Sequence, residues 1–231
     1  MAEALRIAIV GAESTGKTWL AQALAQRLAE VTGLRCAAVD EWLRIWCERE
    51  GRTPRPDEQP AIAQAQQALI DEAAAAHDLV VCDTTPLMTA VYSDLLFDDR
   101  SLHGYAVEQQ RRCQLTLLTA LDIAWEPDGL QRDGPQVRPP VDQRVRSLLI
   151  GHALPWALVA GLGPARLEAA LDAVSPLLRG RTRAGDGLFT RLAERDEAAR
   201  AQAAAWRWVC EDCDVADCEH AALRLRGQRT V

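Results

Sequence analysis

The stretch from Gly11 to Thr18, GAESTGKT, has the residue types and spacing of a phosphate-binding loop. Its glycines would let backbone N–H groups wrap round a β-phosphate at the start of a helix. Lys17 would neutralise the β- and γ-phosphates, and Thr18 would hold Mg²⁺ through its hydroxyl. A simple glycine-rich turn would leave Lys17 without a role. We therefore predict nucleotide binding by Gly11, Glu13, Ser14, Thr15, Gly16, Lys17 and Thr18.

Carboxylates follow two other predicted strands and bear on where the terminal phosphate goes. Asp40 and Glu41 come after one strand, and Asp83 ends another. Because the carboxyl ends of parallel strands meet at one crevice, these groups should converge near the γ-phosphate. One could order Mg²⁺ through water, which we expect of Asp83, and another could accept the proton of an attacking hydroxyl. Alternatively, Asp40 or Glu41 merely caps the following helix.

A segment rich in glycine, proline and arginine, WEPDGLQRDGPQVRPP at 125–140, is predicted to cover the site. Phosphoryl transfer needs a cover that excludes water and brings cations to the transferring group. Arg132 and Arg138 suit that task, although a surface loop with solvated charges is the alternative interpretation. An arginine-bearing excursion between two strands favours a small-molecule kinase over a motor or a switch.

The elements that must position these residues alternate between strand and helix patterns. Short apolar runs predict strands at 5–10, 34–39, 79–82, 114–118 and 156–160. Helical spacing predicts helices at 19–29, 40–50, 61–76, 89–96, 144–151 and 164–178, with a further helix ending near 112. This alternation predicts an α/β domain over 1–180 with a doubly wound, mainly parallel sheet of the P-loop NTPase or nucleoside-kinase type.

Charge and hydropathy limit the partners of the chain. A formal net charge of −7 over 231 residues argues against nucleic-acid and anionic-membrane surfaces. The first strand begins close to Met1, which leaves no room for a signal peptide, and no apolar run approaches the roughly 20 residues of a membrane span. We therefore expect a cytoplasmic protein that acts on a small molecule.

The composition changes after a linker-like stretch at 179–187, so we predict a separate tail over 181–231. Within it, Cys210, Cys213, Cys218 and His220 form the pattern C-x₂-C-x₄-C-x-H. Four such ligands have the chemistry for a structural, tetrahedral Zn²⁺ site. An acidic, exposed tail with free thiols is the alternative. A zinc-stapled tail could also dock a protein partner.

Four segments match, in order, the motifs of one known family. They are GAESTGKT at 11–18, DEWLR at 40–44, VVCDTTPLMTAVYSDLLF at 80–97 and LDIAWEPDGLQR at 121–132. Over about residues 5–178 the chain thus resembles the ribosylnicotinamide kinase domain of NadR-like proteins, a P-loop group close to the AAA_28 ATPase/kinase family. Trp42 stands where that family has tyrosine, and Gln131 where it has arginine.

The resemblance implies that ATP, with Mg²⁺, phosphorylates nicotinamide riboside to nicotinamide mononucleotide, a step of NAD biosynthesis. Trp125 would stack on the pyridine ring, a favourable contact for a cationic heterocycle. Asp128 and Glu41 would address the ribose hydroxyls, with Trp42 in the place of a tyrosine that reads the substrate. Asp83 or Glu41 would act as the base toward the 5′-hydroxyl.

Two further expectations stay open. Arg166 follows the last predicted strand, where such folds place an adenine-contacting loop, and could stack on the base; a role in starting the next helix is equally consistent. The whole chain could also be an ATP-binding regulatory or interaction module, in which hydrolysis is slow and the tail docks a partner.

Overall fold

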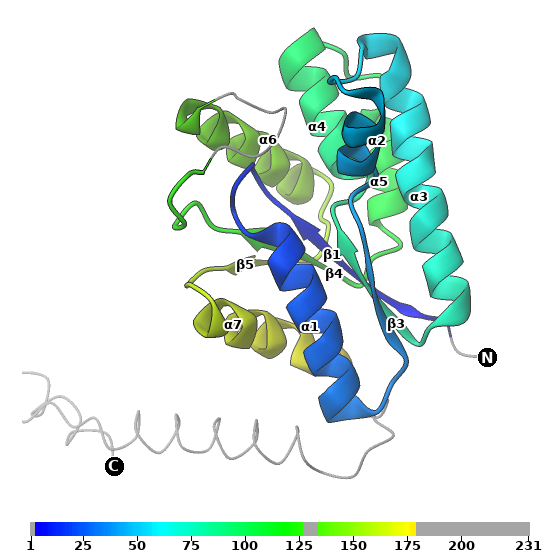
Figure 1. Ribbon diagram of the computed structural model, residues 1–231, viewed down its shortest axis with the longest axis vertical. Coiled ribbons are helices and arrows are strands. Elements are labelled where there is room, and N and C mark those ends of the chain that lie inside the picture. The colour runs from blue at the N-terminus through cyan, green and yellow to red at the C-terminus, as the bar shows by residue number, and fades with distance from the viewer. Residues whose placement is uncertain (1–2, 127–133, 179–231) are drawn as a thin grey trace, which may run out of the picture. The chain divides into compact units, whose positions relative to one another are not determined.

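The predicted strands form one parallel sheet in the computed structural model, which describes residues 3–126 and 134–178. Its five strands are β1 (Leu5–Val10), β2 (Cys36–Val39), β3 (Leu79–Asp83), β4 (Leu115–Thr119) and β5 (Trp156–Val159). They lie in the order β2-β3-β1-β4-β5, and every neighbouring pair is parallel (Figure 1). The predicted α/β fold is confirmed. Because β1 is central and fully buried, the loop that follows it leaves from the middle of the sheet's carboxyl edge.

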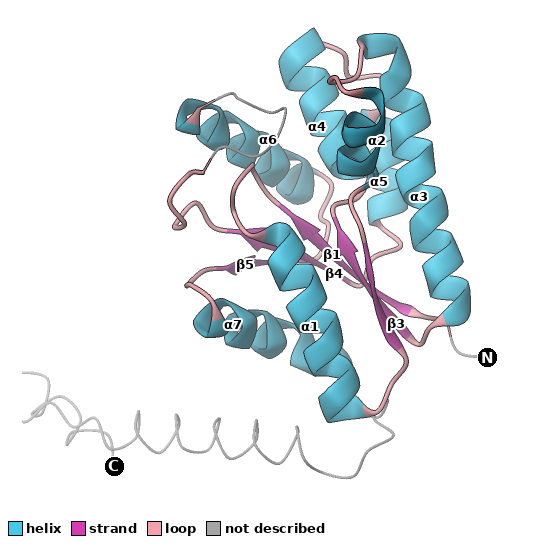
Figure 2. Ribbon diagram, in the orientation of Figure 1, coloured by secondary structure: helices cyan, strands magenta, loops and turns pink. Residues whose placement is uncertain are grey.

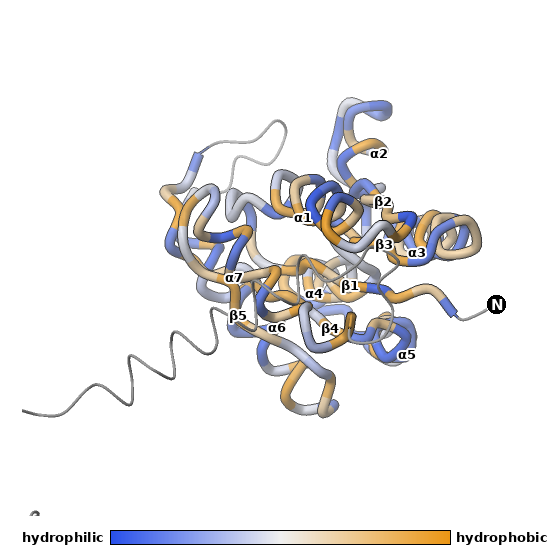
Figure 3. The backbone as a smooth tube through the Cα atoms, turned by 90° about the horizontal axis from the view of Figure 1, so that it is seen from below, coloured by the Kyte–Doolittle hydropathy of each residue, from blue (hydrophilic) through white to orange (hydrophobic). Residues whose placement is uncertain are grey.

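Helices cover both faces of this sheet (Figure 2). One face carries α1 (Lys17–Thr32) and α7 (Pro164–Val174). The other carries α3 (Gln59–Ala76), α4 (Pro86–Phe97), α5 (His103–Gln110) and α6 (Arg138–Gly151). The short helix α2 (Trp42–Glu50) packs beside α3. Figure 3 shows the layers from below, with α1 on one side of the strands and α5 and α6 on the other.

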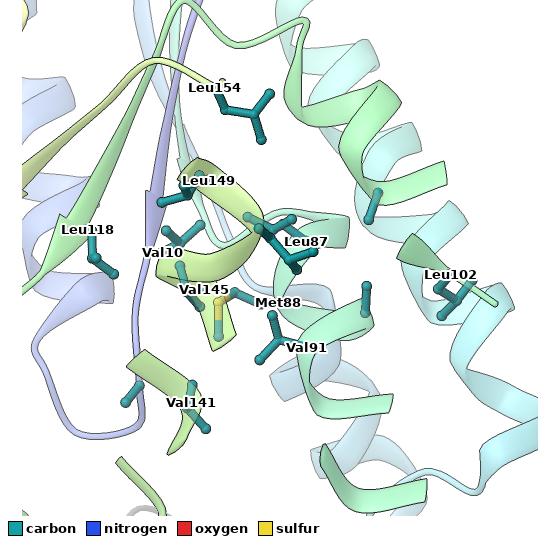
Figure 4. Packing of buried hydrophobic residues seen from close by; sticks show 14 of the residues in the cluster. Val10, Leu87, Met88, Val91, Leu102, Leu118, Val141, Val145, Leu149 and Leu154 are labelled. Atoms are coloured by element: carbon teal, nitrogen blue, oxygen red, sulfur yellow. The ribbon is translucent and has the colours of Figure 1, made fainter. Parts of the chain in front are cut away.

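A hydrophobic cluster joins α4 and α6 to the middle of the sheet (Figure 4). Its buried side chains include Val10, Leu87, Met88, Val91, Leu118, Val141, Val145 and Leu149. Burying one side chain of this size stabilises the fold by roughly 1.5–3 kcal/mol. The cluster therefore fixes α4 and α6, whose N-terminal ends lie near the carboxyl edge of the sheet.

Four helices begin earlier than the sequence pattern predicts: α1 and α3 by two residues each, α4 by three and α6 by six. Helix α4 starts at Pro86 rather than 89, and α6 starts at Arg138 rather than 144. In both of these, prolines occupy the first helical turn, where the missing N–H costs no hydrogen bond. The predicted cover at 125–140 is therefore shorter than expected, because its last residues already belong to α6.

Three short 3₁₀ turns complete the described part, at Pro56–Glu58, Pro135–Val137 and Ser175–Leu178. None of the helices described combines the length and hydropathy that crossing a bilayer requires. The predicted tail over 181–231 lies outside the described residues.

Candidate active site

The phosphate loop connects β1 to α1, in the order that the sequence predicts, and α1 begins at Lys17. Its backbone turns through left-handed conformations, with φ of 53° at Ser14 and 74° at Gly16. Glycine is the residue that adopts these angles at least cost. At Gly11 the restriction is steric as well, because an added Cβ would collide with Thr119 Oγ1 and lie 3.3 Å from the Thr119 carbonyl oxygen.

Hydrogen bonds within and around the loop hold this shape. The Thr15 hydroxyl donates to the Ala12 carbonyl oxygen at 2.8 Å and lies 2.7 Å from the Thr119 hydroxyl. The Glu126 N–H donates to Ser14 Oγ at 2.9 Å. Both partners come from β4 or from the segment after it, so the neighbouring strand braces the loop.

A cavity of about 470 Å³ opens above the loop. It is lined by Ser14, Thr15, Gly16, Lys17, Thr18, Trp19, Arg44, Ile123, Ala124 and Glu126. Two of these residues, Lys17 and Arg44, are cationic. Lys17 Nζ donates to the Ala12 carbonyl oxygen at 2.7 Å, which keeps the ammonium against the loop. Positive side chains over a turn with exposed N–H groups suit a bound polyphosphate. We call this space the phosphate cavity.

Asp83 lies at the end of β3 beside the phosphate cavity. Asp83 is only 2% exposed, and neither of its carboxylate oxygens has a hydrogen-bond partner in the described part of the chain. Burial raises the pKa of Asp83, whereas the nearby Thr18 hydroxyl and the charges of Lys17 and Arg44 act to lower it. A buried carboxylate without a partner is costly unless it binds a cation or a proton. Asp83 and the Thr18 hydroxyl thus have the chemistry that Mg²⁺ requires.

A larger cavity, of about 670 Å³, adjoins the phosphate loop on its other side. Its lining comes from the loop, α2, the 53–59 segment, α4 and the start of α6: Glu13, Leu43, Thr53, Pro54, Gln59, Tyr92, Leu95, Leu96, Phe97, Gln136, Val137, Pro140 and Val141. This space is called the acceptor cavity below. The sequence analysis missed it, because its walls come from segments far apart in the chain.

Glu13 and Tyr92 are two of the polar residues that line the acceptor cavity. Glu13 Oε2 is buried and has no hydrogen-bond partner among the described residues. Burial, and then the negative charges of Glu13 and Glu41, raise the pKa of Tyr92 well above its usual range. The tyrosine therefore stays neutral, and the carboxylate keeps one oxygen available to a ligand. Glu13, predicted to bind the nucleotide, in fact lines this second cavity.

Glu41 and Trp42 lie at the start of α2. Glu41 is the N-cap residue, but its side chain makes no capping hydrogen bond and instead lies 3.8 Å from Arg44 Nε. The Trp42 indole lies beneath the guanidinium of Arg49, 5.9 Å from its carbon atom, and does not line either cavity. Its neighbours along the chain, Leu43 and Arg44, do so.

Arg138 and Arg166 are buried beneath the site rather than exposed above it. Arg138, only 5% exposed, donates to the Ile123 carbonyl oxygen at 2.8 Å. Its Nε and Nη2 atoms have no hydrogen-bond partner in the described part. It thus holds the segment after β4 from below, a position different from the cover that the sequence predicted.

Arg166 is 1% exposed and pairs with Asp122. It also donates to the carbonyl oxygens of Gly161, at 2.8 Å, and Thr15, at 3.2 Å. Its guanidinium therefore has no exposed face on which a base could stack, and we assign it the support of the phosphate loop in place of the predicted adenine contact. Burial lowers the pKa of Arg166, against the opposing charge of Asp122.

Some predicted site residues lie elsewhere or outside the description. Trp125 is half-buried and lines neither cavity. Asp128 and Arg132 fall in 127–133, and Cys210, Cys213, Cys218 and His220 fall in the tail, all outside the described residues. Within 3–126 and 134–178, no three His, Cys, Asp or Glu side chains cluster as a metal site would need.

The sheet order, the phosphate loop and the carboxylate at the end of β3 together define a P-loop fold of the nucleoside-kinase type. The chain belongs to the AAA_28 family of AAA domains, whose model matches residues 6–166. No curated protein matches the chain.

Solved structures share the fold. NadR protein in complex with NAD and AMP-PNP has a TM-score of 0.60 and 18% identity, with 75% of this chain and 49% of that chain covered. NadR in complex with NR gives 0.59 and 18%, covering 75% and 50%. Thymidylate kinase from Ehrlichia chaffeensis gives 0.53 and 14%, covering 76% of this chain and 100% of the other. The chain thus spans about half the length of the NadR structures that it matches.

Proposed function

We propose that this protein transfers the γ-phosphate of ATP to a hydroxyl group of a nucleoside-like small molecule, and that the acceptor is nicotinamide riboside. The observation that carries the proposal is the pair of adjoining cavities. One has the cationic side chains and the loop that suit a polyphosphate, and the other has an acid and aromatic groups that suit a nucleoside. A motor or a switch that passes phosphate to water has no need of the second cavity.

In this proposal the chain's own groups bind and orient both reactants. The loop and Lys17 hold the β- and γ-phosphates, and Thr18, with Asp83 through water, holds Mg²⁺, which supplies neutralisation of the phosphate charge. Asp83 or Glu41 accepts the proton of the attacking hydroxyl. Asp83 is favoured because its carboxylate is buried without a hydrogen-bond partner, whereas Glu41 is paired with Arg44. A raised pKa brings a carboxylate closer to the working pH of a base.

The charge of the acceptor cavity supports a nucleoside rather than a nucleotide as acceptor. Glu13 is the charged group among its described lining residues, and none of them is lysine or arginine. An acceptor that already carried a phosphate would need such cations. A neutral or cationic nucleoside is compatible with the carboxylate, and the NadR structure in complex with NR has the same fold. Nicotinamide riboside, which has a cationic ring, is therefore the first acceptor to test.

The contacts with that acceptor that we propose come from two sources. The resemblance of the motifs gives Trp125 for the pyridine ring and Asp128 and Glu41 for the ribose. The acceptor cavity adds Leu43, which lines it where Trp42 does not. Trp125→Ala should raise the KM for the nucleoside while leaving ATP affinity unchanged. Equal losses for both ligands would indicate that Trp125 is a packing residue.

A nucleoside screen tests the proposal directly. The full chain is incubated with ATP, Mg²⁺ and one acceptor at a time: nicotinamide riboside, the common ribonucleosides and deoxynucleosides, and thymidylate as a phosphate-bearing control. Mass spectrometry should detect a monophosphate from a nucleoside and no diphosphate from thymidylate, and Lys17→Ala and Asp83→Asn should abolish the product. Slow ATP turnover with no acceptor phosphorylated would instead support a regulatory ATPase module.

For the tail, we also propose a separate unit over 181–231 that Zn²⁺ stabilises through Cys210, Cys213, Cys218 and His220. The support is the ligand spacing and the interleaved acidic residues. Metal analysis of the full chain should find about one equivalent of zinc, lost when Cys210 and Cys213 are both changed to serine. Less than about half an equivalent in the unaltered chain would contradict the assignment.

A further inference from the structure

The two cavities meet along two pairs of neighbouring residues. In the phosphate loop, Glu13 lines the acceptor cavity and Ser14 lines the phosphate cavity. In the first turn of α2, Leu43 lines the acceptor cavity and Arg44 the phosphate cavity. A phosphoryl group that moves from one cavity to the other must therefore pass between the phosphate loop and the first turn of α2.

Arg44 is the cation at this boundary. It lines the same cavity as Lys17 and Thr18, and its charge lowers the pKa of Asp83. Its side chain is 43% exposed, and its Nε lies 3.8 Å from Glu41 Oε2, within ion-pair distance. The guanidinium is thus close to the Asp83 carboxylate and beside the phosphate loop.

The backbone that carries Arg44 is firmly anchored. The Trp42 N–H donates to Gln66 Oε1 at 2.7 Å, and Gln66 Nε2 donates to the Asp40 carbonyl oxygen at 3.2 Å. Gln66 is buried within α3. One side chain therefore binds the residues on both sides of Glu41 and fixes the start of α2. An anchored backbone with a long, partly exposed side chain is the arrangement expected of a cation that contacts a ligand.

We propose that Arg44 is a catalytic residue that contacts the γ-phosphoryl group during its transfer, an inference that rests on the proposed kinase function. In this step the acceptor hydroxyl oxygen forms a bond to the γ-phosphorus, and its proton passes to the carboxylate base. The bond from that phosphorus to the β–γ bridging oxygen breaks, and the nucleoside diphosphate leaves with the electron pair. Arg44 stabilises the negative charge on the phosphoryl oxygens as these bonds exchange.

Arg44 thereby takes the role that was predicted for Arg132 and Arg138. Arg138 is buried below the segment after β4 and donates to Ile123. Arg44 comes instead from the first turn of α2, at the end of the DEWLR segment. Its part in the reaction follows from the position of α2 between the two cavities.

The test compares Arg44→Ala and Arg44→Lys with Arg27→Ala in the full chain. Arg27 is a matched control because it is similarly exposed and also pairs with a glutamate three residues away, but it lines neither cavity. We expect Arg44→Ala to lower kcat roughly 10²- to 10³-fold, as for loss of one preorganised charge-stabilising donor. The KM for the acceptor and the Kd for AMP-PNP should change less than tenfold. Arg44→Lys should recover part of kcat, and Arg27→Ala should match the unaltered protein.

Each outcome supports or overturns the proposed role of Arg44. A kcat for Arg44→Ala within threefold of the unaltered protein, or equal losses in Arg44→Ala and Arg27→Ala, would overturn the role of Arg44 while leaving the kinase function in place. If the unaltered protein phosphorylates no acceptor, the proposed function fails first. The rate of ATP turnover then tests the role of Arg44. An unchanged rate in Arg44→Ala would overturn its contact with the γ-phosphoryl group. Equal melting temperatures exclude loss of fold as the cause.

Discussion

The phosphate cavity and the acceptor cavity share a border but are built in different ways. Most of the phosphate cavity comes from one continuous stretch, residues 14–19, with a glycine-dependent backbone. The acceptor cavity is walled by side chains from five segments of the chain. A site made by a local backbone turn can be recognised from a short motif, whereas a site made by distant side chains depends on the complete fold.

The two cavities also differ in charge. Lys17 and Arg44 line the phosphate cavity, whereas Glu13 lines the acceptor cavity and none of its described lining residues is a cation. Neighbouring residues of one loop, Glu13 and Ser14, therefore face sites of opposite character. Substitutions on the two sides should separate nucleotide binding from acceptor binding.

The largest effect is expected on the nucleotide side, from Lys17→Ala. Removing a cation that neutralises the β- and γ-phosphates should lower kcat about 10³-fold and weaken AMP-PNP binding. Calorimetric titration with the acceptor should give an unchanged Kd, because Lys17 does not line the acceptor cavity. A parallel loss of acceptor affinity would show that the two cavities are not independent.

Gly11→Ala tests the steric requirement of the phosphate loop. The new Cβ would collide with Thr119, so we expect a loss of about 1–3 kcal/mol in the free energy of unfolding and weaker nucleotide binding. Gly104→Ala in α5 is the control, since nothing lies within 4 Å of its added Cβ and alanine favours helix. Chemical denaturation of both variants measures the difference. Equal stabilities would mean that the loop can shift to accommodate the methyl group.

On the acceptor side, Tyr92→Phe should have a smaller effect. It removes the hydroxyl beside Glu13, whose Oε2 atom is already buried without a hydrogen-bond partner among the described residues. We expect the KM for the nucleoside to rise about tenfold, which corresponds to roughly 1.4 kcal/mol, with the Kd for AMP-PNP unchanged. Steady-state kinetics at saturating ATP provide the measurement. A change confined to nucleotide affinity would instead assign Tyr92 and Glu13 to nucleotide binding.

The smallest difference is expected between two neighbours on α2. Leu43→Ala should weaken acceptor binding a few-fold, because Leu43 lines the acceptor cavity. Trp42→Phe should change it less than twofold, because the indole lies against Arg49. The family resemblance implies instead that Trp42 contacts the substrate. Measuring the acceptor KM of both variants distinguishes the two expectations. A larger effect of Trp42→Phe would favour the resemblance.

The sequence was sufficient for the fold class and for the phosphate loop. Strand β1, the glycines and Lys17 follow one another directly along the chain. The local residue pattern is therefore enough to predict the phosphate loop. The start of α6 was missed because prolines at its N-terminus look like a loop, although the first helical turn accepts them. Helix ends of this kind depend on which N–H groups need partners, and a residue pattern does not show that directly.

Buried charges were the least predictable part of the site. Arg166 follows the last predicted strand, where contact with adenine and a role in starting the next helix were equally consistent with the sequence. Its partner Asp122 lies 44 positions away along the chain, and arginine is rarely buried as completely as this unless it is paired. Glu13 shows the same limit, because its neighbour Tyr92 belongs to a distant helix. Such pairings arise from tertiary packing.

The hydrogen bond from Arg166 to the Thr15 carbonyl oxygen joins residues 151 positions apart. On a ribosome, the loop near the start of the chain is made early, but its brace arrives only after β5 and the beginning of α7 have emerged. Before that point, the phosphate loop of the nascent chain would have to bind a nucleotide without the support of Arg166. The phosphate loop, the first functional motif to be synthesised, therefore reaches its supported form only once the beginning of α7 has emerged.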